Sequence, residues 1–183
     1  MLDLNKILNF YYGWWKNIDK FIFFLILFLF SLGLFFSLVS TSIIASDKLN
    51  TNTYYFFIKH LLFILLGVFI LITFSAIEQN RLFQISKYLF IIFLVFLALV
   101  PFLGVEVKGS IRWIDLPLIP RFQPIEILKP FLIIVISSIF AVESQKNIYF
   151  KYLFSFLIIF PVILFLVSQP DLGQALLIVL TWF

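Results

Sequence analysis

The sequence predicts an all-α, polytopic integral membrane protein built as a bundle of spanning helices. Hydrophobic residues make up 63% of the 183 residues, charged residues only 12%, and the mean hydropathy is +1.15. Water-soluble domains carry about twice that share of charge. Apolar runs long enough to cross a hydrocarbon core of about 30 Å also recur along the chain. These observations place most of the chain in a bilayer.

The first spanning helix is predicted over residues 21–45, a run of 25 residues without a charge. Residues 1–20 precede it and contain Trp14, Trp15 and three lysines, which is typical of an interfacial tail at headgroup level. The run is too long for the apolar part of a signal peptide, and no convincing cleavage site follows it. We therefore expect a retained helix preceded by a cytoplasmic or interfacial tail.

Five further apolar runs follow the first span, separated by polar connections. They cover residues 61–77, 88–103, 125–142, 152–168 and 172–183. The last run has only 12 residues, whereas about 20 are needed to cross a bilayer. We expect the sequence to be the N-terminal portion of a longer protein, with residues 21–183 forming part of its transmembrane domain.

The distribution of basic residues predicts the orientation. With the N-terminus in the cytoplasm, seven basic residues outside the spans lie inside and five lie outside. Cytoplasmic loops of membrane proteins are enriched in Lys and Arg, so this bias, although small, has the expected sign. The connection from Glu106 to Lys129 and the turn at Ser168–Asp171 then share the outer face.

Composition excludes several kinds of site. Without cysteine there is no disulfide or thiolate metal site, and a single histidine excludes a histidine-cluster metal site. The net charge of +4 relates to membrane orientation and anionic lipid, and does not indicate nucleic acid. His60 follows Lys59 at a helix entrance, so an interfacial anchor is favoured over a proton relay.

The connection after the third span is rich in basic residues. Lys108, Arg112 and Arg121 accompany Trp113 in an outer segment where basic residues are disfavoured. Arginine offers a planar fork that matches phosphate or carboxylate. The connection therefore predicts either a site for an anionic ligand or contacts with lipid phosphates.

The fourth span opens with a charged pair. Pro124 suits the first helical position, and Glu126 and Lys129 are three residues apart, on one helix face. Pro130 lacks the amide that would bond the carbonyl of Glu126, which predicts a kink there. Charges at such depth are usually functional, although helix capping alone could explain Glu126.

The turn before the last run reads Ser168-Gln169-Pro170-Asp171-Leu172-Gly173-Gln174. Ser168 and Asp171 have capping-box spacing, and Pro170 suits a first helical turn. That interpretation leaves Gln169, Gly173 and Gln174 unexplained. The glycine would allow a backbone or ligand to approach closely.

Three stretches resemble the successive motifs of the shape, elongation, division and sporulation (SEDS) family. They are, in order, KGSIRWIDL, FQPIEILKP and QPDLGQALL, and each lies at a helix boundary. The first motif extended to EVKGSIRWI, the WW-containing tail and KHLLF at the second span are more similar to the cell-division members than to the elongation members. The resemblance covers essentially the whole chain but only the N-terminal half of the family's fold of roughly ten helices.

The resemblance implies polymerisation of lipid II, a lipid-linked disaccharide-pentapeptide, into peptidoglycan glycan strands at the division septum. It also implies a multi-pass protein of the bacterial inner membrane that works with a class B penicillin-binding transpeptidase and other membrane proteins of the divisome. No cofactor is implied. A divalent cation is left open, and these residues predict no site for one.

Carried over residue by residue, the resemblance assigns substrate-binding or tuning roles to positions in all three motifs. Ile125 stands where the family normally has serine, and the family's proposed catalytic aspartate lies in a connection beyond Phe183. The pyrophosphate of lipid II would suit the basic connection. The positions matched to the family are Arg112, Trp113, Glu126, Lys129, Gln169, Pro170, Asp171 and Gly173. With the residues of the basic connection, the candidate residues are Lys108, Arg112, Trp113, Arg121, Gln123, Glu126, Lys129, Gln169 and Asp171.

Two other functions are considered. A lipid II flippase would also use kinked helices and intramembrane charges, but its polar residues should line whole spans, and here they gather at one face. A non-catalytic divisome scaffold would favour small-residue helix interfaces, and the chain has six glycines and no GxxxG motif. Both observations favour chemistry at the outer face.

Overall fold

The computed structural model describes residues 12–41, 54–107, 109–117, 119–141 and 147–183. The chain divides into two compact units, Met1–Ile77 (unit 1) and Glu78–Phe183 (unit 2). Five of its helices are long and apolar enough to cross a membrane, and α8 is a shorter apolar helix. The predicted class, a polytopic membrane helix bundle, is confirmed.

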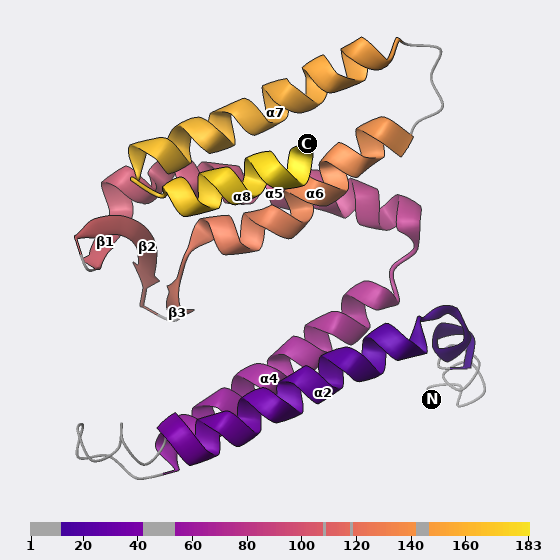
Figure 1. Cartoon of the computed structure of the whole chain (residues 1–183), viewed down its shortest axis with the longest axis vertical. Coiled ribbons are helices and arrows are strands. Elements are labelled where there is room, and N and C mark those ends of the chain that lie inside the picture. The colour runs from indigo at the N-terminus through magenta and orange to yellow at the C-terminus, as the bar shows by residue number, and fades with distance from the viewer. Residues whose placement is uncertain (1–11, 42–53, 108, 118, 142–146) are drawn as a thin grey trace. The chain divides into compact units, whose positions relative to one another are not determined.

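Unit 1 contains α2 (Lys20–Phe36), the π-helical turn η1 (Ser37–Thr41) and α4 (Tyr55–Ser75). The two long helices lie side by side and antiparallel (Figure 1). Asp19 caps α2 by accepting a hydrogen bond from the amide of Ile22 at 3.1 Å. Neither long helix contains a buried residue, and many of their large hydrophobic side chains are exposed.

The N-terminal segment is attached to the end of α4 by one side-chain hydrogen bond. The indole of Trp14 donates to the hydroxyl of Ser75 at 2.9 Å. Trp14 also packs edge-on against Phe23. These contacts hold the described part of the tail against unit 1, and its predicted interfacial position remains a prediction. Residues 1–11, and the end of the first predicted span at residues 42–45, lie outside the described residues.

Unit 2 contains four helices and a small sheet: α5 (Gln79–Leu103), β1 (Gly104–Val107), β2 (Ser110–Leu116), β3 (Ile119–Phe122), α6 (Pro124–Ala141), α7 (Ile148–Ser168) and α8 (Leu172–Trp182). Its core is apolar and draws on all four helices. Fully buried side chains include Leu97 and Val100 of α5, Leu128 of α6 and Leu166 of α7. The sheet and the turn between α7 and α8 lie at the same end of the unit (Figure 1).

Helices α4, α5 and α7 begin before the apolar runs that predicted them. Helix α4 begins at Tyr55 instead of Leu61, and α5 begins at Gln79 instead of Tyr88. The added turns carry Tyr, Lys, Arg and His side chains, which suit headgroup level but lower the hydropathy of a segment. Hydropathy therefore located α4 and α5 and placed their starts too late in the sequence.

The connection from Gly104 to Phe122 is a three-stranded antiparallel sheet in the order β1-β2-β3, which the hydropathy pattern did not predict. Gly109, with φ of +80°, closes the hairpin between Val107 and Ser110, a backbone geometry that glycine adopts without strain. Gly104 joins α5 to β1. A Cβ at Gly104 would lie 2.4 Å from the carbonyl oxygen of Val100, so only glycine fits there.

Candidate functional site

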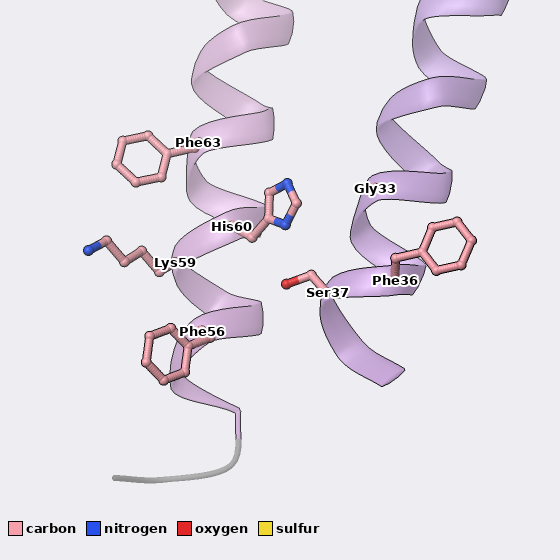
Figure 2. Close-up of a pocket in the computed structure, with 7 residues that line it drawn as sticks. All are labelled: Gly33, Phe36, Ser37, Phe56, Lys59, His60 and Phe63. Carbon is pink, nitrogen blue, oxygen red and sulfur yellow. The ribbon is translucent and has the colours of Figure 1, made fainter. Parts of the chain in front are cut away.

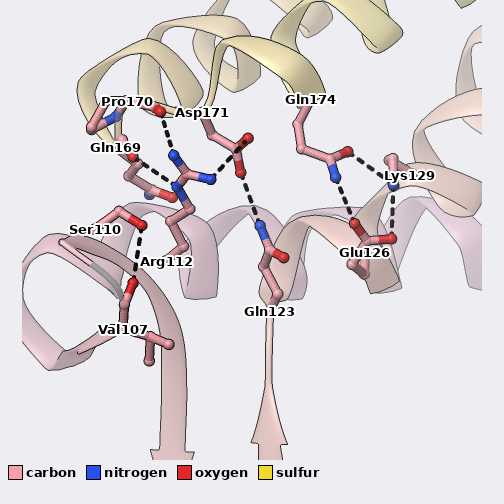
Figure 3. A network of polar contacts seen from close by, with 10 residues as sticks. All are labelled: Val107, Ser110, Arg112, Gln123, Glu126, Lys129, Gln169, Pro170, Asp171 and Gln174. Carbon is pink, nitrogen blue, oxygen red and sulfur yellow. Dashed lines mark hydrogen bonds and ion pairs between the residues drawn. The ribbon is translucent and has the colours of Figure 1, made fainter.

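Arg112 connects the sheet to the turn between α7 and α8. Its Nε donates to the carbonyl of Gln169 at 3.3 Å, one terminal nitrogen donates to the carbonyl of Pro170, and the other lies 3.5 Å from the carboxylate of Asp171 (Figure 3). The two hydrogen bonds use two of the five N–H groups of the guanidinium. The side chain keeps 30% of its surface exposed. Arg112 thus fixes the turn and still presents an edge to solvent or ligand.

Asp171 is the buried acid of this site. Its side chain is 8% exposed, and its second carboxylate oxygen accepts a hydrogen bond from the amide of Gln123 at 3.0 Å (Figure 3). Gln123 immediately precedes α6, so the contact joins the start of α6 to the start of α8. A buried carboxylate needs such partners, because an unpaired charge away from water is costly.

Gln169 is held inside unit 2. It is 5% exposed, and its side-chain amide donates to the carbonyl of Leu97 in α5 at 3.0 Å. That carbonyl lies four residues before Pro101, which has no amide to offer it. The glutamine therefore satisfies an acceptor that the proline leaves open and ties the turn to α5.

Glu126, Lys129 and Gln174 form a closed ring of three contacts. The Lys129 ammonium lies 2.8 Å from the Glu126 carboxylate, which confirms the predicted ion pair. Gln174 of α8 accepts from Lys129 at 2.9 Å and donates to Glu126 at 2.7 Å (Figure 3). One amide from α8 therefore engages both charges of α6. Sequence inspection noted Gln174 as unexplained and did not include it in the site.

The predicted capping box at the start of α8 is wrong. Ser168 is the last residue of α7, and its hydroxyl donates to the carbonyl of Phe165 at 2.7 Å. Asp171 occupies the N-cap position without a side-chain capping hydrogen bond, and Pro170 precedes the helix. The Asp171 carboxylate instead binds Arg112 and Gln123, because a charged donor and a side-chain amide satisfy it better than one helix amide.

Gly173 and Arg121 are not among these contacts. Among the described residues, no atom lies within 4 Å of the position that a Cβ on Gly173 would take, so no close approach is seen there. Arg121 does not join the site: its guanidinium lies 2.7 Å from Asp115, and both side chains are 46% exposed. Lys108 lies outside the described residues.

Trp113 follows Arg112 on β2, so the two side chains project from opposite faces of the strand. It is half-buried and pairs across the sheet with Val105. The structure therefore brings together Arg112, Gln123, Gln169 and Asp171, and beside them Glu126 and Lys129. Trp113 and Arg121 lie on the sheet outside this network.

The site contains too few suitable ligands to predict a metal centre. Over the described part of the chain, no group of three or more His, Cys, Asp or Glu side chains is arranged to hold a metal ion. Within the network, Asp171 is paired with Arg112, and Glu126 is paired with Lys129. The arrangement can orient helix ends and present the exposed edge of the Arg112 guanidinium.

Comparison with known proteins gives consistent matches. The sequence profile of the FtsW, RodA and SpoVE family, described as a cell cycle protein, matches residues 19–183. The chain is 37% identical over 84 residues to the probable peptidoglycan glycosyltransferase FtsW of Caulobacter vibrioides, covering 45% of this chain and 21% of that protein. The chain therefore spans only part of the length of this relative.

Three solved structures, two of them of the same protein, share the fold. The rod-shape-determining protein RodA of Thermus thermophilus superposes with a TM-score of 0.69 at 24% identity, over 87–88% of this chain and 50% of RodA. A chain from a structure described as "Structural coordination of polymerization and crosslinking by a peptidoglycan synthase complex" gives a TM-score of 0.59 at 25% identity, over 81% of this chain and 44% of that chain.

The fold and the site define a multi-pass membrane protein whose polar residues gather where a small sheet meets the starts of two helices. The family's sequence profile matches nearly the whole chain, residues 19–183. The chain belongs to the FtsW, RodA and SpoVE family of membrane proteins, the SEDS family.

Proposed function

We propose that the complete protein is a peptidoglycan glycosyltransferase that polymerises lipid II into glycan strands during septal cell-wall synthesis. Membership of the family and the name of the Caulobacter relative support peptidoglycan synthesis in general. The similarity of the WW-containing tail, of KHLLF at the second span and of EVKGSIRWI to cell-division members favours the septal role.

The observation that carries the proposal is the joining of three sequence motifs into one polar network. Asp171, before α8, contacts both Arg112 of β2 and Gln123 before α6, although the three residues are far apart in sequence. The Glu126–Lys129–Gln174 ring lies next to them along α6 and α8 (Figure 3). A purely lipid-anchoring set of basic residues would not require these buried amide and carboxylate partners.

The chemistry proposed for this network is electrostatic. In glycosyl transfer from lipid II, negative charge develops on the departing pyrophosphate, and fixed positive groups lower the energy of that transition state. The exposed edge of Arg112 is suited to this role. Lys108 and Arg121 belong to the same basic connection, and their part in binding the substrate is a prediction from the sequence. Glu126 and Lys129 would shape the cavity and tune a general base supplied by the rest of the protein.

The partners and the location are proposed on the same basis. We propose that the protein acts in the bacterial inner membrane, with a cytoplasmic N-terminus, alongside a class B penicillin-binding transpeptidase and other divisome proteins. The matched chain from a complex described as coordinating polymerisation and crosslinking supports such a partnership. The weak basic-residue bias supports the orientation.

A reconstitution experiment tests the proposal. The complete protein would be purified with its cognate transpeptidase and given labelled lipid II, and glycan ladders would be resolved on a gel. We expect ladders from the wild type, severe loss in Arg112→Gln and Lys129→Gln, and full activity in the control Arg81→Gln, whose exposed side chain pairs only with Glu78 among the described residues.

The possible outcomes distinguish an error in the proposed function from an error in the assigned site residues. Absence of ladders from the wild type with its partner, in conditions where a known polymerase is active, would overturn the proposed function. Full polymerisation by both Arg112→Gln and Lys129→Gln would instead overturn the assignment of the network, and leave the function standing.

A further inference from the structure

A second group of polar residues lies in unit 1, between the end of α2 and the start of α4. A cavity of about 550 Å³ is lined there by Ser37 of η1 and by Lys59 and His60 of α4. The Ser37 hydroxyl and the His60 imidazole point into the space between the helices, and the Lys59 ammonium points away from it (Figure 2). Phe36, Phe56 and Phe63 complete most of the lining. None of the residues of the unit 2 network contributes to it, so the inference below does not depend on the proposed function.

His60 lies within the space between the two helices. Its imidazole faces α2 at Gly33, where an added Cβ would lie 3.7 Å from Cε1 and 3.9 Å from Nε2 (Figure 2). The absence of a side chain at Gly33 keeps this part of the cavity open. A neutral imidazole still carries one N–H donor, so His60 can bind an acceptor at neutral pH.

Ser37 faces His60 from the other helix. It is 7% exposed, and its hydroxyl points toward α4 (Figure 2). Ser37 is also where α2 widens into the π-helical turn η1, and its amide is shared between the carbonyls of Gly33 and Leu34. Such turns are rare and are often found at functional sites, because the extra residue re-aims a side chain.

Phenylalanines flank the basic pair along α4. One stripe on the helix is formed by Phe56, Lys59 and Phe63, which are three or four residues apart. His60 projects from the side of α4 that faces α2 (Figure 2). With a rise of 1.5 Å per residue, Lys59 lies about 6 Å from the start of a helix roughly 30 Å long. The basic pair therefore lies near headgroup level, with Phe63 deeper along the same stripe.

The described lining combines donors with aromatic surface and contains no carboxylate. Lysine, imidazole and hydroxyl groups at one depth suit a phosphate, and phenylalanine rings beside them suit hydrocarbon chains. We propose that this cavity binds one anionic phospholipid, with its phosphate at His60 and Ser37, the positive charge of Lys59 at the rim, and its acyl chains against the phenylalanines.

Lipid titration tests this site. The complete protein in detergent would be titrated with dioleoylphosphatidylglycerol, and bound lipid counted by native mass spectrometry. We expect one tightly held lipid in the wild type and about fivefold weaker binding in Lys59→Gln, as expected for loss of one basic contact at a membrane surface. His60→Leu should also weaken binding, and Lys59→Arg should retain it.

Two further variants separate a built site from general charge attraction. Lys20→Gln removes the same charge from an exposed position at the far end of α2 and should bind as the wild type. Gly33→Leu leaves every charge in place but fills the space beside His60, so it should lose the lipid. Thermal unfolding of each variant would show whether it is folded.

Three results would overturn the proposal. The first is unchanged phosphatidylglycerol binding by folded Lys59→Gln and His60→Leu. The second is equal weakening by Lys20→Gln, which would indicate diffuse charge. The third is complete displacement of the lipid by millimolar inorganic phosphate, which would make free phosphate the ligand; we expect phosphate to compete poorly and phosphatidylcholine to bind more weakly.

Discussion

Arg112 of β2 lies 3.5 Å from Asp171 at the start of α8, and the carboxylate of this pair is 8% exposed. The contact joins the sheet to the helix turn that follows α7. Because the same guanidinium also binds the carbonyls of Gln169 and Pro170, one side chain fixes three consecutive residues of the turn. The basic connection between α5 and α6 therefore both holds the site in shape and contributes to its exposed surface.

Arg112→Met should destabilise the complete protein strongly. It would leave Asp171 buried without its cationic partner, which costs about 3 kcal/mol for pairs of this kind. Thermal unfolding in detergent would measure the loss. The double variant Arg112→Met with Asp171→Asn should recover part of it, because no uncompensated charge remains; simple additivity of the two single changes would contradict a coupled pair.

Gln174→Leu should weaken the attachment of α8 to α6. The change removes two hydrogen bonds to charged groups and leaves the Glu126–Lys129 ion pair intact. Since Glu126 is half-exposed, we expect a loss of about 1–2 kcal/mol in unfolding free energy. Glu78→Gln, which breaks an exposed ion pair with Arg81, is the control and should cost less than about 0.5 kcal/mol. Equal losses of unfolding free energy in the two variants would contradict a stabilising role of the Glu126–Lys129–Gln174 ring.

Arg121→Gln should hardly change stability. Its ion pair with Asp115 is 46% exposed on both sides, so it contributes less than about 1 kcal/mol, and salt should screen it. A raised KM for lipid II with unchanged unfolding temperature would support the substrate role predicted from the sequence. An unchanged KM would mean that Arg121 takes no part in binding lipid II and acts only within the sheet.

Gly104→Ala should be more damaging than Gly109→Ala. At Gly104 the new methyl group would lie 2.4 Å from the Val100 carbonyl and 2.5 Å from Ile111, so α5 and the sheet must separate. We expect about 1–3 kcal/mol for this overpacking. At Gly109 no atom lies within 4 Å, and only the strain of φ at +80° remains, about 1 kcal/mol. Unfolding measurements on both variants would check the order.

Local patterns in the sequence predicted the membrane class, the start of α6 at Pro124 and the Glu126–Lys129 pair. Hydropathy sums over neighbouring residues, and an i, i+3 pair depends only on helix geometry, so neither requires knowledge of the fold. The resemblance to the SEDS family rested on motifs of the same local kind and was confirmed by the family match.

Only the tertiary structure decided how the polar residues are paired. Asp171 has helix-cap spacing in the sequence, yet its carboxylate binds Arg112 and Gln123; Gln169 binds a carbonyl of α5, and Gln174 spans both charges of α6. The sheet between α5 and α6 was likewise not predicted. A buried polar group takes whichever donor or acceptor packing brings within about 3 Å, and these partners come from elements distant in sequence.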